Sequence, residues 1–393
     1  MTILIHYAEI GLKGKNRAFF ENRLVGNIKE KFKSIKNTKV EKLRGRIILI
    51  LPRRKISKKE VQRKLKKVFG IAWFAFARKT ESKIKKIKTL VKQSAKKISS
   101  KETFAIRVKR ADKNFSLQSS KAEQILGRLV ENATKAKVDL TNPDKTLFLE
   151  INKKETYLFW KKIRGLGGLP VGVSGKVICL FSGGIDSVVA AYLLAKRGAK
   201  PVLVHFSAIP LQRVKKSKII KIYEKIQEYI RQTKLYIVPY DYFQMSILDK
   251  DTPGVKNPPP RGRDLRYEVL LFRRFMRKVA EKIAQKEKAL GLVTGDNLGQ
   301  VASQTLENLA IFDKGVGLPI FRPLLGYDKQ EIVNLAKKIG TYELSILPYK
   351  DCCSIIQKNP ITRGKWEVVA KLEKEIEMEK IVKQSLRDLN LRG

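Results

Sequence analysis

A predicted strand, a glycine turn and a predicted helix follow one another near the middle of the chain, and this run restricts the fold more than any other feature. Val177–Phe181 has the apolar composition of a buried strand, Ser182–Ser187 reads Ser-Gly-Gly-Ile-Asp-Ser, and Val188–Arg197 is an apolar helix. At such a junction the unpaired backbone N–H groups and the positive end of the helix dipole meet in the turn. The run therefore predicts an anion site of the kind that holds phosphate groups.

The residues of the turn fit the phosphates of ATP. Gly183 and Gly184 leave the backbone N–H groups uncovered, and Ser182 and Ser187 add hydroxyl donors. Asp186 suits an anion site when Mg²⁺ lies between its carboxylate and the phosphates. The chain lacks the Gly-x-x-x-x-Gly-Lys-Ser/Thr run of a Walker A loop, and the turn instead resembles the pyrophosphate loop (PP-loop) of N-type ATP pyrophosphatases. Those enzymes cleave ATP between its α and β phosphates and transfer AMP; a turn without a catalytic role is the alternative.

Strands and helices alternate from about residue 168 to the end, which predicts an α/β domain with a doubly wound parallel sheet. The strands are expected at Val177–Phe181, Val202–His205, Leu235–Val238 and Leu290–Val293. The helices are expected at Ser187–Arg197, Ser217–Gln232, Leu265–Lys286, Gly299–Ile311 and Lys329–Ile339. An open α/β sheet binds its ligand at the carboxyl ends of the strands.

Candidate ligand contacts follow these predicted strands. His205 and Phe206 end the second strand and are candidates to flank the adenine or the ribose, although a lone histidine there is as often structural as functional. Gly295 follows a later strand and permits close approach of the backbone. Arg273, on a predicted helix, has the length to reach a phosphate.

The three cysteines are too few for a disulfide framework. Cys352 and Cys353 are adjacent in a loop-like run beside Lys350. A nearby cation lowers the pKa of a thiol and favours the nucleophilic thiolate, so the pair predicts a reactive cysteine. The alternative is two buried small apolar side chains. Cys179 lies in the middle of a predicted strand and is expected in the core.

The domain boundaries are predicted from composition. The run Arg164–Gly175 is rich in glycine and contains a proline, so it separates an N-terminal part with short strands and basic helices from the α/β part. We expect three domains, at residues 1–75, 76–167 and 168–393.

The charge balance indicates a polyanionic partner. The chain has 84 Lys+Arg and 37 Asp+Glu, a formal net charge of +47, so nucleic acid and an anionic membrane surface are the two candidates. No apolar run approaches the roughly 20 residues of a membrane span, and the first residues lack a signal-peptide pattern. We therefore expect a cytoplasmic protein that binds nucleic acid and no membrane.

Five cations, in a glycine turn and on the polar face of a predicted strand, are candidate RNA contacts, with a solvated surface as the alternative: Lys13, Lys15, Arg17, Arg107 and Lys109.

Long stretches of the chain resemble the tRNA 4-thiouridine synthetase family, the tRNA uracil 4-sulfurtransferases. The similar runs are residues 7–17, 168–177, 182–187, 294–307, 322–329, 339–343 and 351–353, the last reading Asp-Cys-Cys. The resemblance covers nearly the whole chain. It implies an N-terminal ferredoxin-like α+β domain, a THUMP RNA-binding domain and a PP-loop ATP pyrophosphatase domain.

The resemblance implies an enzyme that makes 4-thiouridine in tRNA. The first two domains would bind the acceptor region of tRNA, ATP would adenylate the C4 oxygen of a uridine, and a persulfide would then attack that carbon. By the family pattern Cys353 carries the sulfur, with Cys352 the second choice, and Asp186 and Lys329 match positions tied to ATP chemistry. The matching nucleotide contacts are Leu180, Phe181, His205, Phe206, Arg273, Gly295 and Gln304.

The expected sulfur source depends on a domain that some family members have and that we do not expect here. The chain ends soon after Cys353, so we expect no rhodanese domain, which some members use to deliver sulfur. A cysteine desulfurase, a free-standing rhodanese or sulfide would then be the donor. Family members pair as dimers, so the resemblance implies a homodimer; it leaves open a role in sulfur supply for thiamine synthesis.

Two other functions share part of these features. A different AMP-forming PP-loop enzyme, such as a tRNA-lysidine or argininosuccinate synthetase, would keep the ATP turn and need no cysteine. A non-catalytic THUMP protein would bind tRNA without releasing pyrophosphate. The intact turn Ser182–Ser187, with its glycines and Asp186, argues against this last function.

Overall fold

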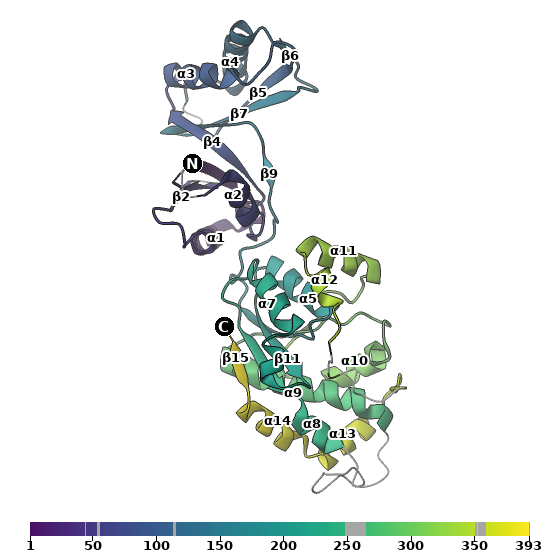
Figure 1. Cartoon of the computed structure of the whole chain (residues 1–393). Coiled ribbons are helices and arrows are strands. Elements are labelled where there is room, and N and C mark those ends of the chain that lie inside the picture. Colours follow the sequence, from purple (N-terminus) through teal and green to yellow (C-terminus); the bar gives the residue numbers. More distant parts are fainter. Residues whose placement is uncertain are drawn as a thin grey trace. The chain divides into compact units, whose positions relative to one another are not determined.

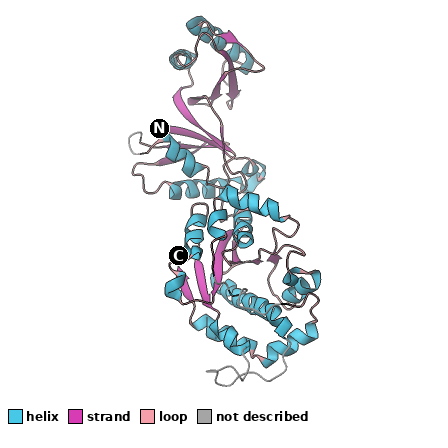
Figure 2. Ribbon diagram, turned by 45° about the vertical axis from the view of Figure 1, so that its right-hand side comes forward, coloured by secondary structure: helices cyan, strands magenta, loops and turns pink. Residues whose placement is uncertain are grey.

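The computed structural model describes residues 1–43, 45–52, 56–112, 115–247, 265–349, 352 and 359–392. The chain forms two compact units, Met1–Gly168 and Leu169–Gly393 (Figures 1 and 2). The division falls inside the glycine-rich run at 164–175. No helix in the described ranges is long and apolar enough to cross a membrane.

The first unit is built on one mixed sheet with the strand order β2-β3-β1-β4-β8-β7-β5-β6, and β9 pairs with β4. Its strands are β1 Thr2–His6, β2 Lys39–Leu43, β3 Arg46–Ile50, β4 Trp73–Glu81, β5 Thr103–Arg110, β6 Lys137–Val138, β7 Lys145–Ile151, β8 Glu155–Phe159 and β9 Ile163–Arg164. Its α-helices are α1 Arg17–Lys31, α2 Lys58–Leu65, α3 Ile84–Ala95 and α4 Ser119–Thr134, and the short 3₁₀ turns η1 Glu9–Leu12 and η2 Gly14–Asn16 precede α1.

Strand β4 belongs to both halves of this sheet. Its first residues pair antiparallel with β1, and its last residues pair antiparallel with β8. One apolar core lies under α1 and α2 and includes Leu24, Val61 and Phe74. A second lies under α3 and α4 and includes Val91 and Leu126. The boundary that we place after residue 75 falls within β4, so the two halves share a strand although each has its own core.

The second unit contains a sheet with the strand order β14-β13-β10-β11-β12-β15, parallel from β14 to β12 (Figure 1). Its strands are β10 Lys176–Leu180, β11 Lys200–Ser207, β12 Leu235–Pro239, β13 Leu292–Val293, β14 Ile320–Phe321 and β15 Asn390–Arg392. Its α-helices are α5 Ile185–Lys196, α6 Leu211–Val214, α7 Lys218–Gln227, α8 Asp241–Ile247, α9 Glu268–Glu287, α10 Leu306–Asp313, α11 Lys329–Ile339, α12 Tyr342–Ser345, α13 Trp366–Glu375 and α14 Met378–Arg387. The 3₁₀ turns η3 Leu265–Tyr267 and η4 Ala302–Gln304 precede α9 and α10.

The predicted parallel sheet is confirmed, with differences in detail. Two strands were not expected: β14, which pairs parallel with β13, and β15, which pairs antiparallel with β12. Helix α10 begins at Leu306 rather than at residue 299, because Thr305 is extended and its side chain accepts the Asn308 N–H as an N-cap. Helix α7 ends at Gln227, short of the predicted residue 232.

Helices cover both faces of this sheet. Helices α5, α7, α11 and α12 pack together on one face, and α8, α9, α13 and α14 pack together on the other (Figure 1). The main core lies between the sheet and the second group and includes Ile178, Leu292, Phe275 and Val279. The carboxyl ends of the parallel strands are thereby left between α5 and α9.

Candidate functional site

The turn between β10 and α5 is held by its own hydroxyl groups. Ser182 Oγ accepts a hydrogen bond from the Gly184 N–H at 3.2 Å and lies 3.2 Å from Ser187 Oγ. Ser187 Oγ in turn donates to the Gly184 carbonyl at 3.2 Å. Gly183 has a φ of +76°, a left-handed conformation that glycine adopts without strain. The turn is therefore fixed in shape just before α5 begins.

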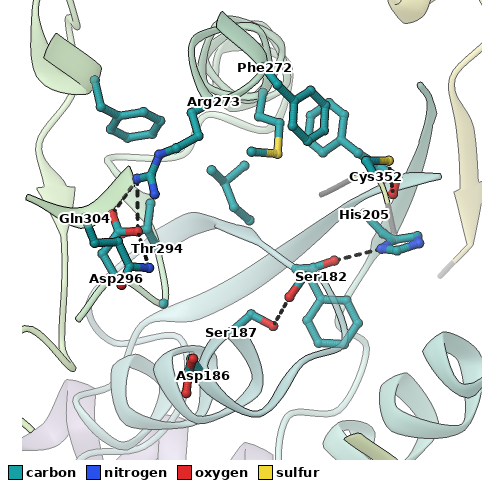
Figure 3. Close-up of a pocket in the computed structure, with 16 residues that line it drawn as sticks. Ser182, Asp186, Ser187, His205, Phe272, Arg273, Thr294, Asp296, Gln304 and Cys352 are labelled. Atoms are coloured by element: carbon teal, nitrogen blue, oxygen red, sulfur yellow. Dashed lines mark hydrogen bonds and ion pairs between the residues drawn. The ribbon is translucent and has the colours of Figure 1, made fainter. Parts of the chain in front are cut away.

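A pocket of about 200 Å³ lies beside this turn, at the carboxyl ends of β10, β11 and β13 (Figure 3). The structure brings these predicted residues together in its lining: Leu180, Phe181, Ser182, Asp186, Ser187, His205, Phe206, Arg273, Gly295, Gln304 and Cys352. Gly183 and Gly184 belong to the adjoining turn and not to the lining. The lining also contains residues that we did not name as candidates: Phe272, Met276, Thr294, Asp296 and Phe312.

One wall of the pocket is apolar. Helix α9 contributes Phe272 and Met276, which are four residues apart and therefore on one face of the helix. Phe206 meets Phe272 edge-on, with ring centroids 6.1 Å apart. The sequence could have indicated both residues, because they lie near the predicted contact Arg273 on the same predicted helix and are four residues apart. An apolar, aromatic wall of this kind suits a nucleobase.

Asp186 and Lys329 form an ion pair at the edge of the site. Lys329 Nζ donates to both carboxylate oxygens of Asp186, at 2.6 and 2.9 Å, and Gln300 Nε2 donates to Oδ2 at 3.1 Å. Lys329 is the first residue of α11, and an Asp328–Glu331 capping box fixes the start of that helix. Two residues that lie far apart in the sequence thus meet at the helix N-terminus of α5.

A buried ion-pair network forms the opposite side. Asp296 accepts hydrogen bonds from Arg273 Nη2 at 2.9 Å to each oxygen, and from Thr294 at 2.8 Å. Arg322 Nε adds a contact at 3.2 Å and also pairs with Asp313. Burial would raise the pKa of Asp296, but the two guanidinium groups and Thr294 outweigh it and hold the pKa below its usual range. The sequence contained one signal for Asp296, its place directly after Gly295 at a strand end.

Gly295 has a packing role. A Cβ atom at this position would lie 2.8 Å from Ser187 N and 2.9 Å from the Asp186 carbonyl carbon. These are backbone atoms of α5, which cannot move aside as the end of a flexible side chain can. Glycine therefore permits the end of β13 to approach the start of α5, and this approach joins the Asp296 network to the turn.

The second strand end joins the pocket to the cysteine region. His205 is buried; its Nδ1 lies 2.9 Å from the Phe181 carbonyl oxygen and its Nε2 lies 2.9 Å from Tyr349 Oη. Cys352 is also buried, and its Sγ donates to the Phe206 carbonyl at 3.4 Å. Cys353, like Lys350 and Asp351, lies outside the described residues.

Cys179 is a core residue, as expected from its place in a strand. It is buried in β10, and burial raises the pKa of its thiol above the ordinary value. It takes no part in the pocket lining among the described residues.

The first unit contains a basic groove of about 1320 Å³ that spans both halves of its sheet. Its cationic lining residues are Lys58, Lys59, Arg63, Lys66, Arg78, Lys79, Lys97 and Lys161, and its aromatic ones are Phe76 and Trp160. Lys58 Nζ lies 5.7 Å from the centroid of the Phe76 ring. Cations interleaved with aromatic rings are typical of surfaces that bind single-stranded nucleic acid.

The five cations that we singled out as RNA contacts do not line this groove. Arg17 pairs with Glu21 at 3.1 Å, and Lys13 lies 5.1 Å from the centroid of the Phe20 ring. Arg107 donates to the Leu140 carbonyl. Lys15 and Lys109 are exposed.

Comparisons with known proteins agree with this architecture. The family described as Thiamine biosynthesis protein (ThiI) matches residues 172–378, its ferredoxin-like domain matches 2–75, and the THUMP domain matches 81–161. A probable tRNA sulfurtransferase of Thermoanaerobacter sp. (strain X514) is 40% identical over 383 residues, which are 97% of this chain and 96% of the relative. The chain belongs to the ThiI family. Another relative, a probable tRNA sulfurtransferase of Brevibacillus brevis, is 37% identical over 389 residues, which are 98% of this chain and 94% of the relative.

Solved structures of similar fold include a member with ligands. A 4-thiouridine synthetase in complex with RNA and with bound ATP covers 100% of this chain and 98% of its own, with a TM-score of 0.85 and 34% identity. PH1313 from Pyrococcus horikoshii shares the fold, with a TM-score of 0.66 at 23% identity over 86% of this chain. The predicted combination of ferredoxin-like, THUMP and PP-loop parts is confirmed by these matches.

Proposed function

We propose that this chain is a tRNA sulfurtransferase that makes 4-thiouridine and that the pocket of the second unit binds ATP. The observation that carries the proposal is the meeting of the Ser182–Ser187 turn, the Asp186–Lys329 pair and Arg273 at one end of the parallel sheet. Family membership and the ATP and RNA bound to the 4-thiouridine synthetase neighbour support it.

The nucleotide lies with its base against the apolar wall and its phosphates at the turn. Phe272 and Met276 offer the surface for adenine, and the N–H groups at the start of α5 face the phosphates. A single carboxylate beside phosphates fits Mg²⁺, which keeps water ligands and seldom needs a full set of protein ligands. Asp186 would hold the ion, which would neutralise phosphate charge as pyrophosphate leaves. Lys329, now paired with Asp186, would be free to contact a phosphate oxygen once the ion is there.

The proposed chemistry proceeds in two steps. The C4 oxygen of the uridine attacks the α phosphorus, the N3 proton is lost, the bond to pyrophosphate breaks, and AMP becomes attached to that oxygen. The terminal sulfur of a persulfide on Cys353 then attacks C4, and AMP leaves with the oxygen. A second thiol cleaves the remaining S–S bond, which leaves sulfur on the base and a disulfide that an external thiol reduces. Cys352 is the second choice for the sulfur carrier.

The remaining partners belong to the same proposal. The first unit binds the acceptor region of tRNA through its basic groove, with the net charge of +47 favouring the polyanion. A cysteine desulfurase or a free-standing rhodanese supplies the outer sulfur of the persulfide. Sulfide, the third candidate donor, would instead attack the adenylated C4 directly, with AMP as the leaving group. The chain acts as a homodimer. The thiamine-biosynthesis description of the matching family supports an additional role in sulfur supply for thiamine synthesis.

The test is to mix the purified protein with tRNA, ATP, magnesium, a cysteine desulfurase with cysteine and an external thiol, and to measure AMP and 4-thiouridine by mass spectrometry. Wild-type protein is expected to form both. Asp186→Ala is expected to form neither and to bind tRNA as wild type does. AMP formation without 4-thiouridine in wild type would favour a different AMP-forming enzyme. Full 4-thiouridine formation in Cys353→Ala would exclude Cys353 as the sulfur carrier, and the absence of AMP with wild type would refute the proposal.

A further inference from the structure

The run that leads to the two cysteines is attached to the pocket mainly by polar contacts of its described residues. Ile346 and Leu347 are 51% and 41% exposed, so apolar packing holds this run only weakly. Polar contacts replace it: Lys218 Nζ, at the start of α7, donates to the carbonyls of Ser345 and Leu347 at 2.7 and 2.8 Å. These contacts fix the beginning of the run, which we call the cysteine stem (residues 345–349), to helix α7.

Tyr349 fixes the other end of the cysteine stem. Its hydroxyl lies 2.9 Å from His205 Nε2, and its ring centroid is 5.7 Å from that of the imidazole (His205 is labelled in Figure 3). The Phe181 carbonyl can only accept, so His205 Nδ1 carries the proton and donates to it. In the neutral ring Nε2 is then an acceptor, and Tyr349 donates. The Phe181 carbonyl thus fixes the tautomer of His205, and this tautomer accepts the hydrogen bond from the Tyr349 hydroxyl.

Cys352 completes the attachment. Its thiol donates to the carbonyl of Phe206, the residue after His205, and its side chain lines the pocket. The contacts of Tyr349 and Cys352 therefore fall on two consecutive residues of β11, both of which face the pocket. Whatever fills the pocket must share this end of β11 with the cysteine stem.

We propose that Tyr349 is a positioning residue that, through His205, couples ligand binding in the pocket to the placement of the thiol of Cys352. The inference rests on the proposed function, in which a cysteine must hold its sulfur next to the activated uridine. Coupling between two sites is reciprocal: a nucleotide that packs against His205 and Phe206 protects the Cys352 thiol, and loosening Tyr349 removes that protection.

The experiment compares Tyr349→Phe with Tyr342→Phe, which removes a hydroxyl from α12 without touching the pocket. Iodoacetamide alkylation is followed by peptide mass spectrometry, with fragment ions that separate Cys352 from Cys353, with and without a non-hydrolysable ATP analogue. Tyr349→Phe is expected to speed alkylation of Cys352 about fivefold, the change expected when one hydrogen bond worth about 1 kcal/mol is lost. The analogue should slow alkylation in wild type and in Tyr342→Phe, and much less in Tyr349→Phe.

A second readout separates positioning from general stability. Tyr349→Phe is expected to keep the melting temperature within about 4 °C of wild type, because a change near 1 kcal/mol shifts a unit of this size by only about 2–4 °C. It should nevertheless make less 4-thiouridine for each AMP formed. Equal alkylation rates in Tyr349→Phe and wild type, or an unchanged ratio of 4-thiouridine to AMP, would overturn the inference. If wild type forms no AMP, the proposed function fails while the alkylation result still tests the coupling.

Discussion

Replacing Asp296 by asparagine removes the charge that holds two guanidinium groups at the pocket. The carboxylate is 4% exposed and accepts hydrogen bonds from Arg273, Thr294 and Arg322. Removal of one partner from a buried ion pair costs about 3–5 kcal/mol. Asparagine keeps one acceptor oxygen, so we expect Asp296→Asn to lower the free energy of unfolding by about 2–4 kcal/mol.

The matched control is Asp313→Asn. Asp313 also pairs with Arg322, but its side chain is 42% exposed, and exposed pairs contribute about 0–1 kcal/mol. Scanning calorimetry is the assay, and the Asp296→Asn transition should fall by about 4–16 °C, against a few degrees at most for Asp313→Asn. In addition, the KM for ATP should rise in Asp296→Asn because Arg273 loses its anchor, while tRNA affinity stays unchanged.

The effect of Asp296→Asn should also depend on pH. The pKa of Asp296 is lowered in the folded state, so its contribution to stability is fully present above the unfolded pKa of about 3.9 and is lost as the pH falls through the folded pKa. The difference from wild type should therefore be largest near neutral pH and shrink below about pH 4. If Asp296→Asn lowers the free energy of unfolding at pH 7 by less than about 1 kcal/mol, or by no more than Asp313→Asn does, the reasoning is refuted.

Three further results are expected. Gly295→Ala, whose Cβ would meet the α5 backbone at 2.8 Å, should abolish AMP formation and leave tRNA binding intact; retention of full activity would contradict the packing role. Glu287 is buried, which would raise its pKa, but Lys234, Tyr236 and Lys176 lower the pKa to about 2. The free energy of unfolding of wild type should therefore fall by about 1–2 kcal/mol relative to that of Glu287→Gln as the pH falls from about 4 to 2. This figure allows for solvent screening at the two lysines. A pH-independent difference would argue against these ion pairs. Affinity for tRNA should fall steeply between 50 and 200 mM salt, about a thousandfold for six phosphate contacts, and a flat response would exclude the basic groove as the RNA surface.

The sequence was informative where local chemistry decides the structure. The run from Val177 to Arg197 could be placed because strand, turn and helix each have a local signature. Helix α11 has the predicted bounds, Lys329–Ile339, because Asp328 caps its start and Gly340 ends it in a left-handed conformation. Residues that follow or end the predicted strands indicated part of the pocket lining (Ser182, Asp186, Ser187, His205, Phe206 and Gly295), whereas the family resemblance supplied Leu180, Phe181 and Gln304.

Features that depend on distant partners could not be predicted in this way. Strand β15 is three residues of mixed polarity, and only its pairing with β12 more than a hundred residues earlier makes it a strand. The place of Asp296 at a strand end does not predict its ion pairs, which depend on Arg273 and Arg322 from two other elements. Tyr349 lies in a run without periodicity, and its role depends on His205, 144 residues away.

The central claim is that ATP activates the C4 oxygen of a uridine in tRNA. The most direct measurement uses tRNA labelled with ¹⁸O at that oxygen, in a reaction with ATP, magnesium and sulfide, followed by mass spectrometry of the products. The account predicts that ¹⁸O appears in the phosphate of AMP in the same amount as 4-thiouridine is formed. Thiolated tRNA with unlabelled AMP, or with ¹⁸O released into water, would contradict it.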